Sequence, residues 1–232
     1  MEVRLGSLLR DAQEAQGTAI IIDVFRAFTT AAIAFDRGVE RIILVAEVEE
    51  ALALQRRGVG DVLMGEVDGA KPDGFDFGNS PHEISEADRA DLSGKTVVQS
   101  TRAGTVGVAA ASQAQRIYLG SLVVAEATVE SIKNENPELV SIIAMGDQAE
   151  IRNDEDEQCG LFLRNMLEGR RPDGFAVARL IMEGGATRKF YDAKQVQYHP
   201  EDVDLALDIN RYNFAMKVTR EQGMLVARKH EL

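Results

Sequence analysis

Residues 19–24 read Ala-Ile-Ile-Ile-Asp-Val, an apolar run of strand length that is interrupted near its end by one carboxylate, Asp23. A second run, Arg41 to Val45, follows a segment rich in small residues, Ala27 to Arg37, which stops at Gly38. Continuous apolar runs are typical of strands buried on both faces, and glycine commonly ends a helix. This stretch therefore predicts a strand, a helix and a second strand in one buried unit.

The same alternation continues along the chain. Further strands are predicted at 62–64, 96–99, 116–119, 139–145 and 224–227, and further helices at 47–57, at 124–133, from the acidic residues 154–157 through Leu167, and at 202–210. Strands that alternate with helices indicate an α/β fold, with a layered sheet of mixed or mostly parallel strands and helices on both faces. No repeat or linker divides the sequence, so we expect a single domain over residues 1–232.

The composition limits the classes of protein that the chain can be. Its 232 residues are 45% hydrophobic and 28% charged, which is enough for a substantial core. There are 26 basic and 38 acidic residues, and the net charge of -12 argues against nucleic-acid binding. Cys159 is the only cysteine, so a disulfide within the chain is excluded. Without a signal-like N-terminus or an apolar run of roughly 20 residues, we expect a cytoplasmic protein that makes no membrane contact.

Polar residues gather where predicted strands end, which is where open α/β sheets bind ligands. Three groups stand out: Asp23 with Arg26, Thr29 and Thr30; Glu66, Asp68, Asp76, Asn79 and Ser80; and Glu155 with Asp156. The second group lies in residues 65–81, where four glycines and two prolines predict a long ordered loop. Each group has an alternative structural explanation, because carboxylates can cap helices and Asn79 and Ser80 can stabilise a turn.

An anion site is indicated at residues 100–105, Ser-Thr-Arg-Ala-Gly-Thr, between an apolar run and a helix of small residues. Backbone N–H groups at a helix N-terminus attract anions, and Arg102 can hold two oxygens of a phosphate or sulfonate. Helix capping explains the turn equally well when it is considered alone. Carboxylates beside an anion-binding turn favour Mg²⁺, which often bridges carboxylates to a phosphate. Zinc is not favoured, because the three histidines and Cys159 lack ligand spacing.

Taken in order, these segments resemble those of the 2-phosphosulfolactate phosphatase family. Residues 22–30, Ile-Asp-Val-Phe-Arg-Ala-Phe-Thr-Thr, are similar to its Asp-Val-Leu-Arg-Ala-Thr-Thr segment. Gly65-Glu66 and residues 74–81, Gly-Phe-Asp-Phe-Gly-Asn-Ser-Pro, resemble its Gly-Glu and Gly-Phe-Asp-x-Gly-Asn-Ser-Pro motifs. Residues 100–105, 120–122 and 155–159 resemble its Ser-Thr-x-x-Gly-Thr, Gly-Ser-Leu and Glu-Asp-x-x-Cys segments. The string at 74–81 is the most specific of these.

The resemblance implies a Mg²⁺-dependent acid phosphatase that converts 2-phosphosulfolactate to sulfolactate and inorganic phosphate, a step of coenzyme M biosynthesis. Two departures bear on the substrate. Arg102-Ala103 stands where relatives often carry Thr-Asn, and Phe28 stands where a threonine is common. Either change can alter which group beside the phosphate is accepted, and a family by itself does not determine a substrate.

With the family's chemistry, the motifs predict a site that hydrolyses a phosphate monoester with Mg²⁺. The expected catalytic residues are Asp23, Arg26, Glu66 and Asp76. Metal ligands are expected among Asp23, Glu66, Asp76, Glu155 and Asp156, and substrate binding from Arg26, Asn79, Ser100, Thr101, Arg102, Gly104 and Thr105. The metal would neutralise phosphate charge and lower the pKa of an attacking water. A covalent aspartyl-phosphate at Asp23 is the alternative route.

Two other functions are compatible with the same residues. A non-catalytic protein could bind a small phosphorylated or sulfonated metabolite with the same arginines and turn, and a Mg²⁺-dependent lyase could act on a carboxylated phosphate. Release of inorganic phosphate separates an enzyme from the first, and product analysis separates the second. As partners we expect a small anionic substrate and no nucleic acid, and apolar residues of the tail are compatible with a homodimer interface.

Overall fold

The nine strands of the chain form one continuous sheet. The computed structural model describes residues 1–232. The strands are β1 (Glu2–Ser7), β2 (Thr18–Ile22), β3 (Arg41–Val45), β4 (Val62–Gly65), β5 (Thr96–Ser100), β6 (Arg116–Gly120), β7 (Leu139–Ala144), β8 (Phe214–Glu221) and β9 (Met224–Glu231). The helices are α1 (Leu8–Glu14), α2 (Ala27–Asp36), α3 (Val48–Arg56), α4 (Pro81–Glu86), α5 (Arg89–Leu92), α6 (Gly104–Ala110), α7 (Ala125–Glu135), α8 (Asp154–Leu167), α9 (Gly174–Glu183) and α10 (Pro200–Ala206), with 3-10 turns η1 (Leu122–Val124) and η2 (Arg188–Tyr191).

The sheet has two parallel parts that are joined by an antiparallel hairpin. Its strand order is β1-β7-β2-β6-β8-β9-β3-β5-β4. Strands β1, β7, β2 and β6 run parallel to one another, and so do β3, β5 and β4. Strands β8 and β9 pair antiparallel with each other and with their outer neighbours β6 and β3. The predicted sheet of mixed, mostly parallel strands is therefore confirmed.

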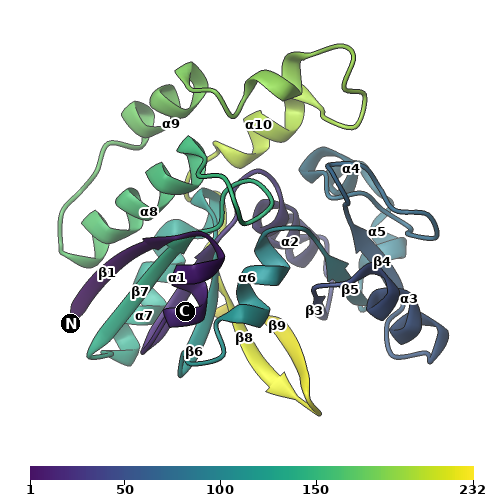
Figure 1. The fold of residues 1–232 in the computed structure, drawn as a ribbon, viewed down its shortest axis with the longest axis horizontal. Coiled ribbons are helices and arrows are strands. Elements are labelled where there is room, and N and C mark those ends of the chain that lie inside the picture. Colours follow the sequence, from purple (N-terminus) through teal and green to yellow (C-terminus); the bar gives the residue numbers. More distant parts are fainter.

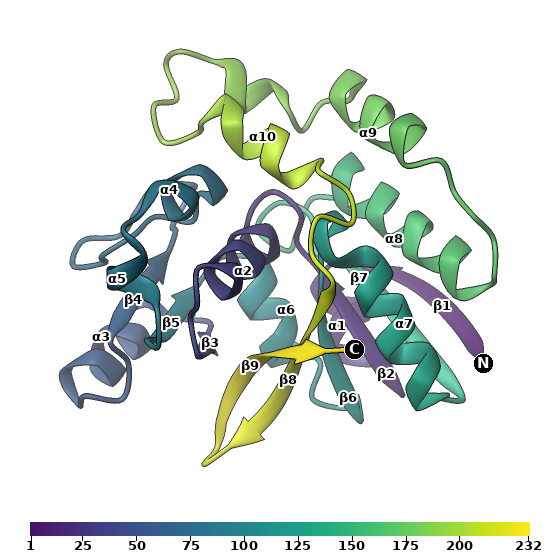
Figure 2. The ribbon, with the colours of Figure 1, turned by 180° about the vertical axis from the view of Figure 1, so that it is seen from behind.

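Helices α2 and α6 lie between the two parallel parts of the sheet, and other helices cover the outer sides (Figure 1). Helix α8 packs against β1 and β7, and α7 packs against α8, β6 and β8, whereas α3 packs against β3, β4 and β5. Seen from behind, the long hairpin of β8 and β9 projects between the two parts (Figure 2). The largest core cluster, 33 buried residues, combines side chains of α2 and α6 with side chains of both parallel parts. This core therefore fixes the strands of the two parallel parts relative to one another.

Helix α2 is composed of small and apolar residues because it is enclosed on all sides. Every residue from Ala27 to Phe35 is buried. A helix without a solvent face has no use for charged positions, which agrees with the sequence Ala-Phe-Thr-Thr-Ala-Ala-Ile-Ala-Phe. In α6, a Cβ atom added at Gly107 would lie 2.4 Å from the sulfur of Met145, so glycine lets this helix approach the strands closely.

Most of the predicted elements are confirmed to within a few residues, but strands β1 and β8 and helices α1, α4, α5 and α9 were missed. Strand β1 is an edge strand with mostly exposed residues, and only the first part of β8 is continuously buried, so neither shows a strong apolar run. Helix α9 exposes apolar side chains, with Phe175 92% exposed, so the spacing of its apolar residues does not mark a buried face. The helix predicted at 202–210 spans Pro200–Ala206, with the proline in its first turn. None of the helices is long and apolar enough to cross a membrane.

Candidate active site

A polar pocket of about 130 Å³ lies where several strand ends come together. Its wall consists of Asp23, Phe25, Arg26, Glu66, Asp68, Gly69, Asn79, Arg102, Ala103, Gly146, Asp147, Gln148, Asn153, Lys189 and Tyr198. Asp23 follows β2, Glu66 follows β4, Arg102 follows β5 and Gly146 follows β7. The structure therefore brings together residues of all three predicted polar groups or their neighbours, from both parts of the sheet.

Asp23 is held between the first turns of two helices. Its Oδ1 accepts the backbone N–H of Ala27 at 2.9 Å, and its Oδ2 accepts that of Gly104 at 2.8 Å. Because Ala27 begins α2 and Gly104 begins α6, the carboxylate faces the positive ends of two helix dipoles. Asp23 therefore does cap the starts of helices, which is the structural explanation that the sequence also allowed for it. This capping does not remove Asp23 from the pocket, since each carboxylate oxygen keeps a second lone pair.

Burial and like charge raise the pKa values of the carboxyls around Asp23. Desolvation, with a smaller contribution from the charge of Glu66, raises the pKa of Asp23 to about 6 against the effect of its backbone N–H donors. Asp156 is buried beside it and accepts the N–H groups of Val24 and Gly146 at 2.7 and 2.8 Å. Desolvation and the charge of Asp23 raise the pKa of Asp156 to about 8. Adjacent carboxyls that resist joint ionisation make this place favourable for a cation.

Glu66 is fixed by backbone groups of two loops. Its Oε1 accepts the N–H of Arg102 and its Oε2 that of Gly69, both at 2.8 Å. Gly69 has a φ of 80°, in the left-handed region that favours glycine, and this turns the loop back onto the carboxylate. The contact with Arg102 joins the loop after β4 to the turn after β5.

The hydroxyls of the turn at 100–105 serve the start of α6. The N–H of Thr101 donates to Oγ1 of Thr105 at 2.9 Å, and the N–H of Thr105 donates to Oγ1 of Thr101 at 3.2 Å. Both threonines and Ser100 are buried, and none of them lines the pocket. The structure therefore does not bring Ser100, Thr101 and Thr105, which were predicted to bind substrate, to the pocket wall, because helix capping uses the threonines and Ser100 lies behind the wall.

The backbone amides of the same turn bind the protein's own carboxylates. The N–H of Arg102 donates to Glu66 and the N–H of Gly104 donates to Asp23. Gly104 does not line the pocket, so its predicted role in substrate binding becomes one of holding Asp23. The N–H of Ala103, in the pocket wall, makes no hydrogen bond within the protein and is the amide that can receive an anion.

Two predicted substrate-binding side chains do reach the pocket with free donors. Asn79 is buried, and its Oδ1 accepts a long hydrogen bond, 3.5 Å, from Gln99, while its Nδ2 has no partner in the protein. The guanidinium of Arg102 is exposed and forms no ion pair. Both groups can donate hydrogen bonds to anionic oxygens.

Arg26 lines the pocket, but its guanidinium is engaged with the protein. Nη1 donates to Oδ2 of Asp202 at 3.1 Å and to the carbonyl of Gln197 at 2.9 Å, and Nη2 donates to the carbonyl of Gly69 at 2.8 Å. The ring of Tyr198 lies 4.7 Å from the guanidinium carbon. Arg26 therefore holds the loop that carries Glu66, and the expected direct catalytic role becomes a positioning role.

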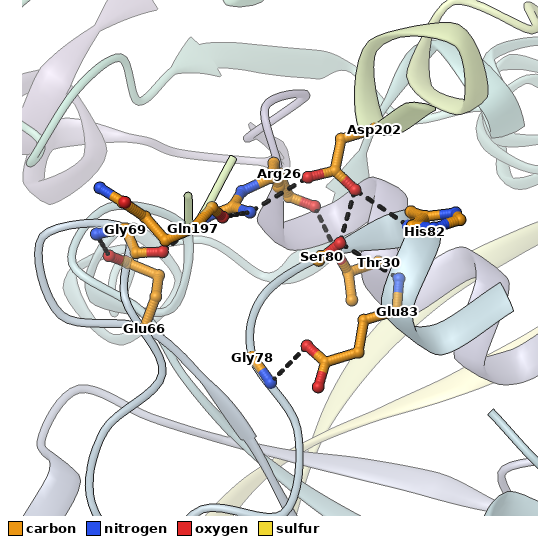
Figure 3. A network of polar contacts seen from close by, with 10 residues as sticks. All are labelled: Arg26, Thr30, Glu66, Gly69, Gly78, Ser80, His82, Glu83, Gln197 and Asp202. Carbon is orange, nitrogen blue, oxygen red and sulfur yellow. Dashed lines mark hydrogen bonds and ion pairs between the residues drawn. The ribbon is translucent and has the colours of Figure 1, made fainter. Parts of the chain in front are cut away.

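Asp202 is the centre of the polar network drawn in Figure 3. Besides Arg26, its carboxylate accepts the hydroxyl of Ser80 at 2.6 Å and the backbone N–H of His82 at 2.9 Å. Both charged side chains of the ion pair are buried, with exposures of 3% for Arg26 and 0% for Asp202. The network ties α10 to the starts of α2 and α4 and, through Gly69, to Glu66.

The structure does not bring Asp76 into the pocket. Its side chain is exposed, and Oδ2 accepts the backbone N–H of Leu63 at 2.7 Å and the side-chain amide of Gln55 at 3.3 Å. These contacts secure the start of the loop after β4. The structure therefore does not bring Asp76, which was expected to be catalytic and to bind metal, together with the other site residues: its neighbour Phe75 is buried in the core, and Asp76 itself is exposed.

Glu155 and Asp156 lie behind the pocket wall rather than in it. Both are in the first turn of α8 and 1% exposed, and they do not line the cavity. Burial and the charge of Asp156 raise the pKa of Glu155 well above its usual value, and its Oε2 has no hydrogen-bond partner. Neither residue is placed as a direct ligand in the pocket. Asp156 instead supports the backbone at Val24 and Gly146.

Sequence reasoning missed several pocket residues in the C-terminal third of the chain. Lys189 and Tyr198 line the cavity, and Asp202 anchors Arg26. They come from segments without a strong periodic pattern and beyond the part of the chain that carries the recognised motifs. Asp147 and Asn153 were also missed, although both lie in the loop that follows the predicted strand at 139–145. The rule that ligands bind at strand ends was signal enough to find these two.

Comparison with known proteins agrees with the motifs. The sequence profile of the 2-phosphosulpholactate phosphatase family matches residues 7–220. A Bacillus subtilis protein named "Probable 2-phosphosulfolactate phosphatase" is 30% identical over 205 residues, covering 87% of each chain. A protein of the same name from Caldicellulosiruptor saccharolyticus is 37% identical over 161 residues, which cover 68% of this chain and 65% of the relative. A third protein of this name, from Carboxydothermus hydrogenoformans, is 28% identical over 222 residues, which cover 92% of this chain and 91% of the relative. The chain belongs to the 2-phosphosulfolactate phosphatase family, whose members are phosphoric monoester hydrolases.

Proposed function

We propose that this protein is a Mg²⁺-dependent phosphatase that hydrolyses the phosphate monoester of a small organic anion, with 2-phosphosulfolactate as substrate and sulfolactate and inorganic phosphate as products. The observation that carries the proposal is the meeting of Asp23 and Glu66 with the unpaired Arg102 in one polar pocket. Carboxylates beside a free guanidinium suit phosphoryl chemistry, which depends mainly on positioning and electrostatics. The names of the family and of the relatives support the substrate.

The donor set of the pocket fits a hard cation. Four carboxylates line it, those of Asp23, Glu66, Asp68 and Asp147, whereas Arg26 is already paired with Asp202. Such a wall repels a phosphate dianion unless further positive charge is present. No three metal-ligating side chains are grouped to form a protein cage. This agrees with Mg²⁺, which usually takes one or two carboxylates together with substrate oxygens and waters.

Asp23 and Glu66 are the residues we propose to hold the metal. Each of their oxygens accepts only one backbone N–H, so lone pairs remain for a ligand. When bound there, Mg²⁺ neutralises phosphate charge and lowers the pKa of a water. The backbone donors keep both carboxylates oriented before a ligand arrives, which reduces the reorganisation that catalysis requires.

The remaining polar groups of the wall bind the phosphate. The guanidinium of Arg102, the N–H of Ala103 and the side-chain amide of Asn79 have donors without partners in the protein. Together they can bind oxygens of the phosphate and stabilise charge that develops on them. The carboxylate of Asp23 or Glu66 accepts a proton from the attacking water.

Attack by Asp23 itself is the alternative chemical route. We favour direct attack by water, because both oxygens of Asp23 are engaged by backbone N–H groups, which lowers their nucleophilicity. Acid-quenched single turnover with ³²P-labelled substrate distinguishes the two routes. Direct attack by water puts the label in released phosphate and leaves none on the protein. Label on the protein that maps to Asp23 would establish a covalent aspartyl-phosphate instead.

The activity itself is tested by measuring release of inorganic phosphate from a panel of phospho-acids, with Mg²⁺ and with EDTA. We expect release that depends on Mg²⁺ and is greatest for 2-phosphosulfolactate. Binding of these compounds without release would indicate a non-catalytic binding protein. Formation of an unsaturated product together with phosphate would indicate a lyase, which product analysis by mass spectrometry detects.

A further inference from the structure

Lys189 is a cation of the pocket whose charge opposes the rise in the pKa of Asp23, but it makes no direct ion pair. It lies in η2, lines the cavity and forms no ion pair within 4.0 Å. Its Nζ lies 5.1 Å from the ring centre of Tyr198 and 5.9 Å from that of Phe190. Contacts with aromatic faces leave the three N–H donors of an ammonium group able to bind an anion.

The segment around Lys189 is well anchored, so the ammonium group is presented from a fixed backbone. The next residue, Phe190, is 2% exposed, and its ring lies edge-on to those of Phe25 and Tyr198, each at 5.2 Å. Arg26 binds the same segment at the carbonyl of Gln197. A binding group on a rigid support loses less entropy when it engages a ligand.

Arg102 and Lys189 are the two cations of the wall without a carboxylate partner, and they come from separate segments. Resting on the proposed function, we propose that Lys189 determines specificity by binding the carboxylate that the substrate carries besides its phosphate. Arg102, Ala103 and Asn79 then bind the phosphate. A substrate with one anionic group leaves Lys189 unused.

The test compares two phosphate esters that differ in a single acidic group, 2-phospholactate and isopropyl phosphate. Lys189→Gln should raise KM for 2-phospholactate about 10- to 100-fold, the effect of losing a charge-assisted contact, with kcat nearly unchanged. The same variant should leave kcat/KM for isopropyl phosphate within about two-fold of wild type, and Lys189→Arg should restore most of the affinity for the acid. Arg188→Gln is the matched control, because the neighbouring arginine is exposed and does not line this pocket.

Equal losses on both esters would overturn the proposal by assigning Lys189 to the phosphate or to the chemistry, and no loss on the acid would overturn it as well. A second measurement separates failure of this proposal about Lys189 from failure of the proposed function. Calorimetric binding of sulfolactate requires no turnover, and its Kd should rise about 10- to 100-fold in Lys189→Gln even if the protein hydrolyses none of the esters. Unchanged binding of sulfolactate would contradict the assignment of Lys189 alone.

Discussion

Gly104 donates its backbone N–H to Oδ2 of Asp23 at 2.8 Å, across 81 residues of chain. The contact joins the end of β2 to the start of α6 and so connects the two parallel parts of the sheet. Through its other oxygen the same carboxylate binds the first turn of α2. The position of Asp23 therefore depends on two helices that both lie in the central core.

A methyl group at Gly104 should damage the site. An ideal Cβ there would lie 2.8 Å from Oδ2 of Asp23 and 3.1 Å from Cβ of Ala27, and neither neighbour can move freely. Gly104→Ala should lower the free energy of unfolding by about 1–3 kcal/mol and reduce kcat, as urea unfolding and phosphate release would measure. Gly185→Ala is the control, since a Cβ at Gly185 meets nothing within 4 Å. Equal effects of the two substitutions would contradict the close approach.

Removal of the negative charge should lower kcat at Glu66 and leave kcat nearly unchanged at Asp76. Glu66→Gln removes the negative charge and replaces one acceptor oxygen with an N–H₂ group, so that only one of the backbone N–H groups of Arg102 and Gly69 keeps its acceptor, and kcat should fall about 100-fold or more. Asp76→Asn should keep kcat within about two-fold, because the side chain is exposed outside the pocket. Steady-state kinetics at saturating Mg²⁺ checks both. A large loss in Asp76→Asn would restore that residue to the active site.

Stability should fall as the pH rises, because of Asp156. Its pKa is about 8 in the folded protein, whereas that of an unfolded aspartate is about 3.9, so between these values the folded state binds the extra proton. The free energy of unfolding should therefore decrease from about pH 4 to about pH 8 in the absence of divalent cations. Urea unfolding at pH 5, 6, 7 and 8 measures this slope. In Asp156→Asn the slope should be smaller, and an equal slope would show that other groups cause it.

Mg²⁺ should stabilise the protein more at high pH than at low pH. Desolvation raises the pKa of Asp23 to about 6, so the carboxyl is mostly protonated at pH 5 and ionised at pH 8. A metal must displace that proton to bind, which weakens binding in acid. The increase in Tm on adding Mg²⁺ should therefore be larger at pH 8, as differential scanning fluorimetry would measure. Asp23→Asn should abolish the increase, and an increase independent of pH would place the metal elsewhere.

Breaking the buried pair between Arg26 and Asp202 should be strongly destabilising. Asp202→Ala leaves a guanidinium that is 3% exposed without its partner and removes the acceptor of Ser80 and His82. We expect a loss of about 3–5 kcal/mol in the free energy of unfolding. The double variant Arg26→Met/Asp202→Leu should lose less stability than Asp202→Ala, since it leaves no unpaired buried charge, while kcat stays low because Glu66 loses its support.

The strands and helices around the first motifs were predictable, because their local patterns and their packing agree. Residues 42–45 are apolar, and they lie in β3, which spans Arg41–Val45. The irregular conformation of the loop after β4 was also predictable, since its glycines and prolines exclude a helix there. Strand β1 was not predictable: it lies at the sheet edge, half exposed, and its pairing with β7 joins residues far apart in sequence.

Of two predicted site residues, the one that follows a strand lies in the pocket and the one that belongs to a loop lies outside it. Asp23 follows directly on a buried strand, and its carboxylate lies in the pocket as expected. Asp76 belongs to the most specific motif, yet its side chain points outward because Phe75 takes the core position. The turn at 100–105 attracts anions as predicted, but the anions at its amides are Asp23 and Glu66.

The sequence by itself determined the α/β class, the order of most elements, the family and the residue types that phosphoryl chemistry needs. Only the tertiary structure decided which of these residues share a pocket, that Arg26 is bound to Asp202, and that Lys189 reaches the site. The physical reason is that a local sequence pattern reflects which neighbouring residues are buried, whereas the hydrogen-bond partners of a carboxylate depend on which distant segments of the chain pack beside it. The hydrogen bonds from Gly104 to Asp23 and from Arg26 to Asp202 span 81 and 176 residues, and no local periodicity encodes them.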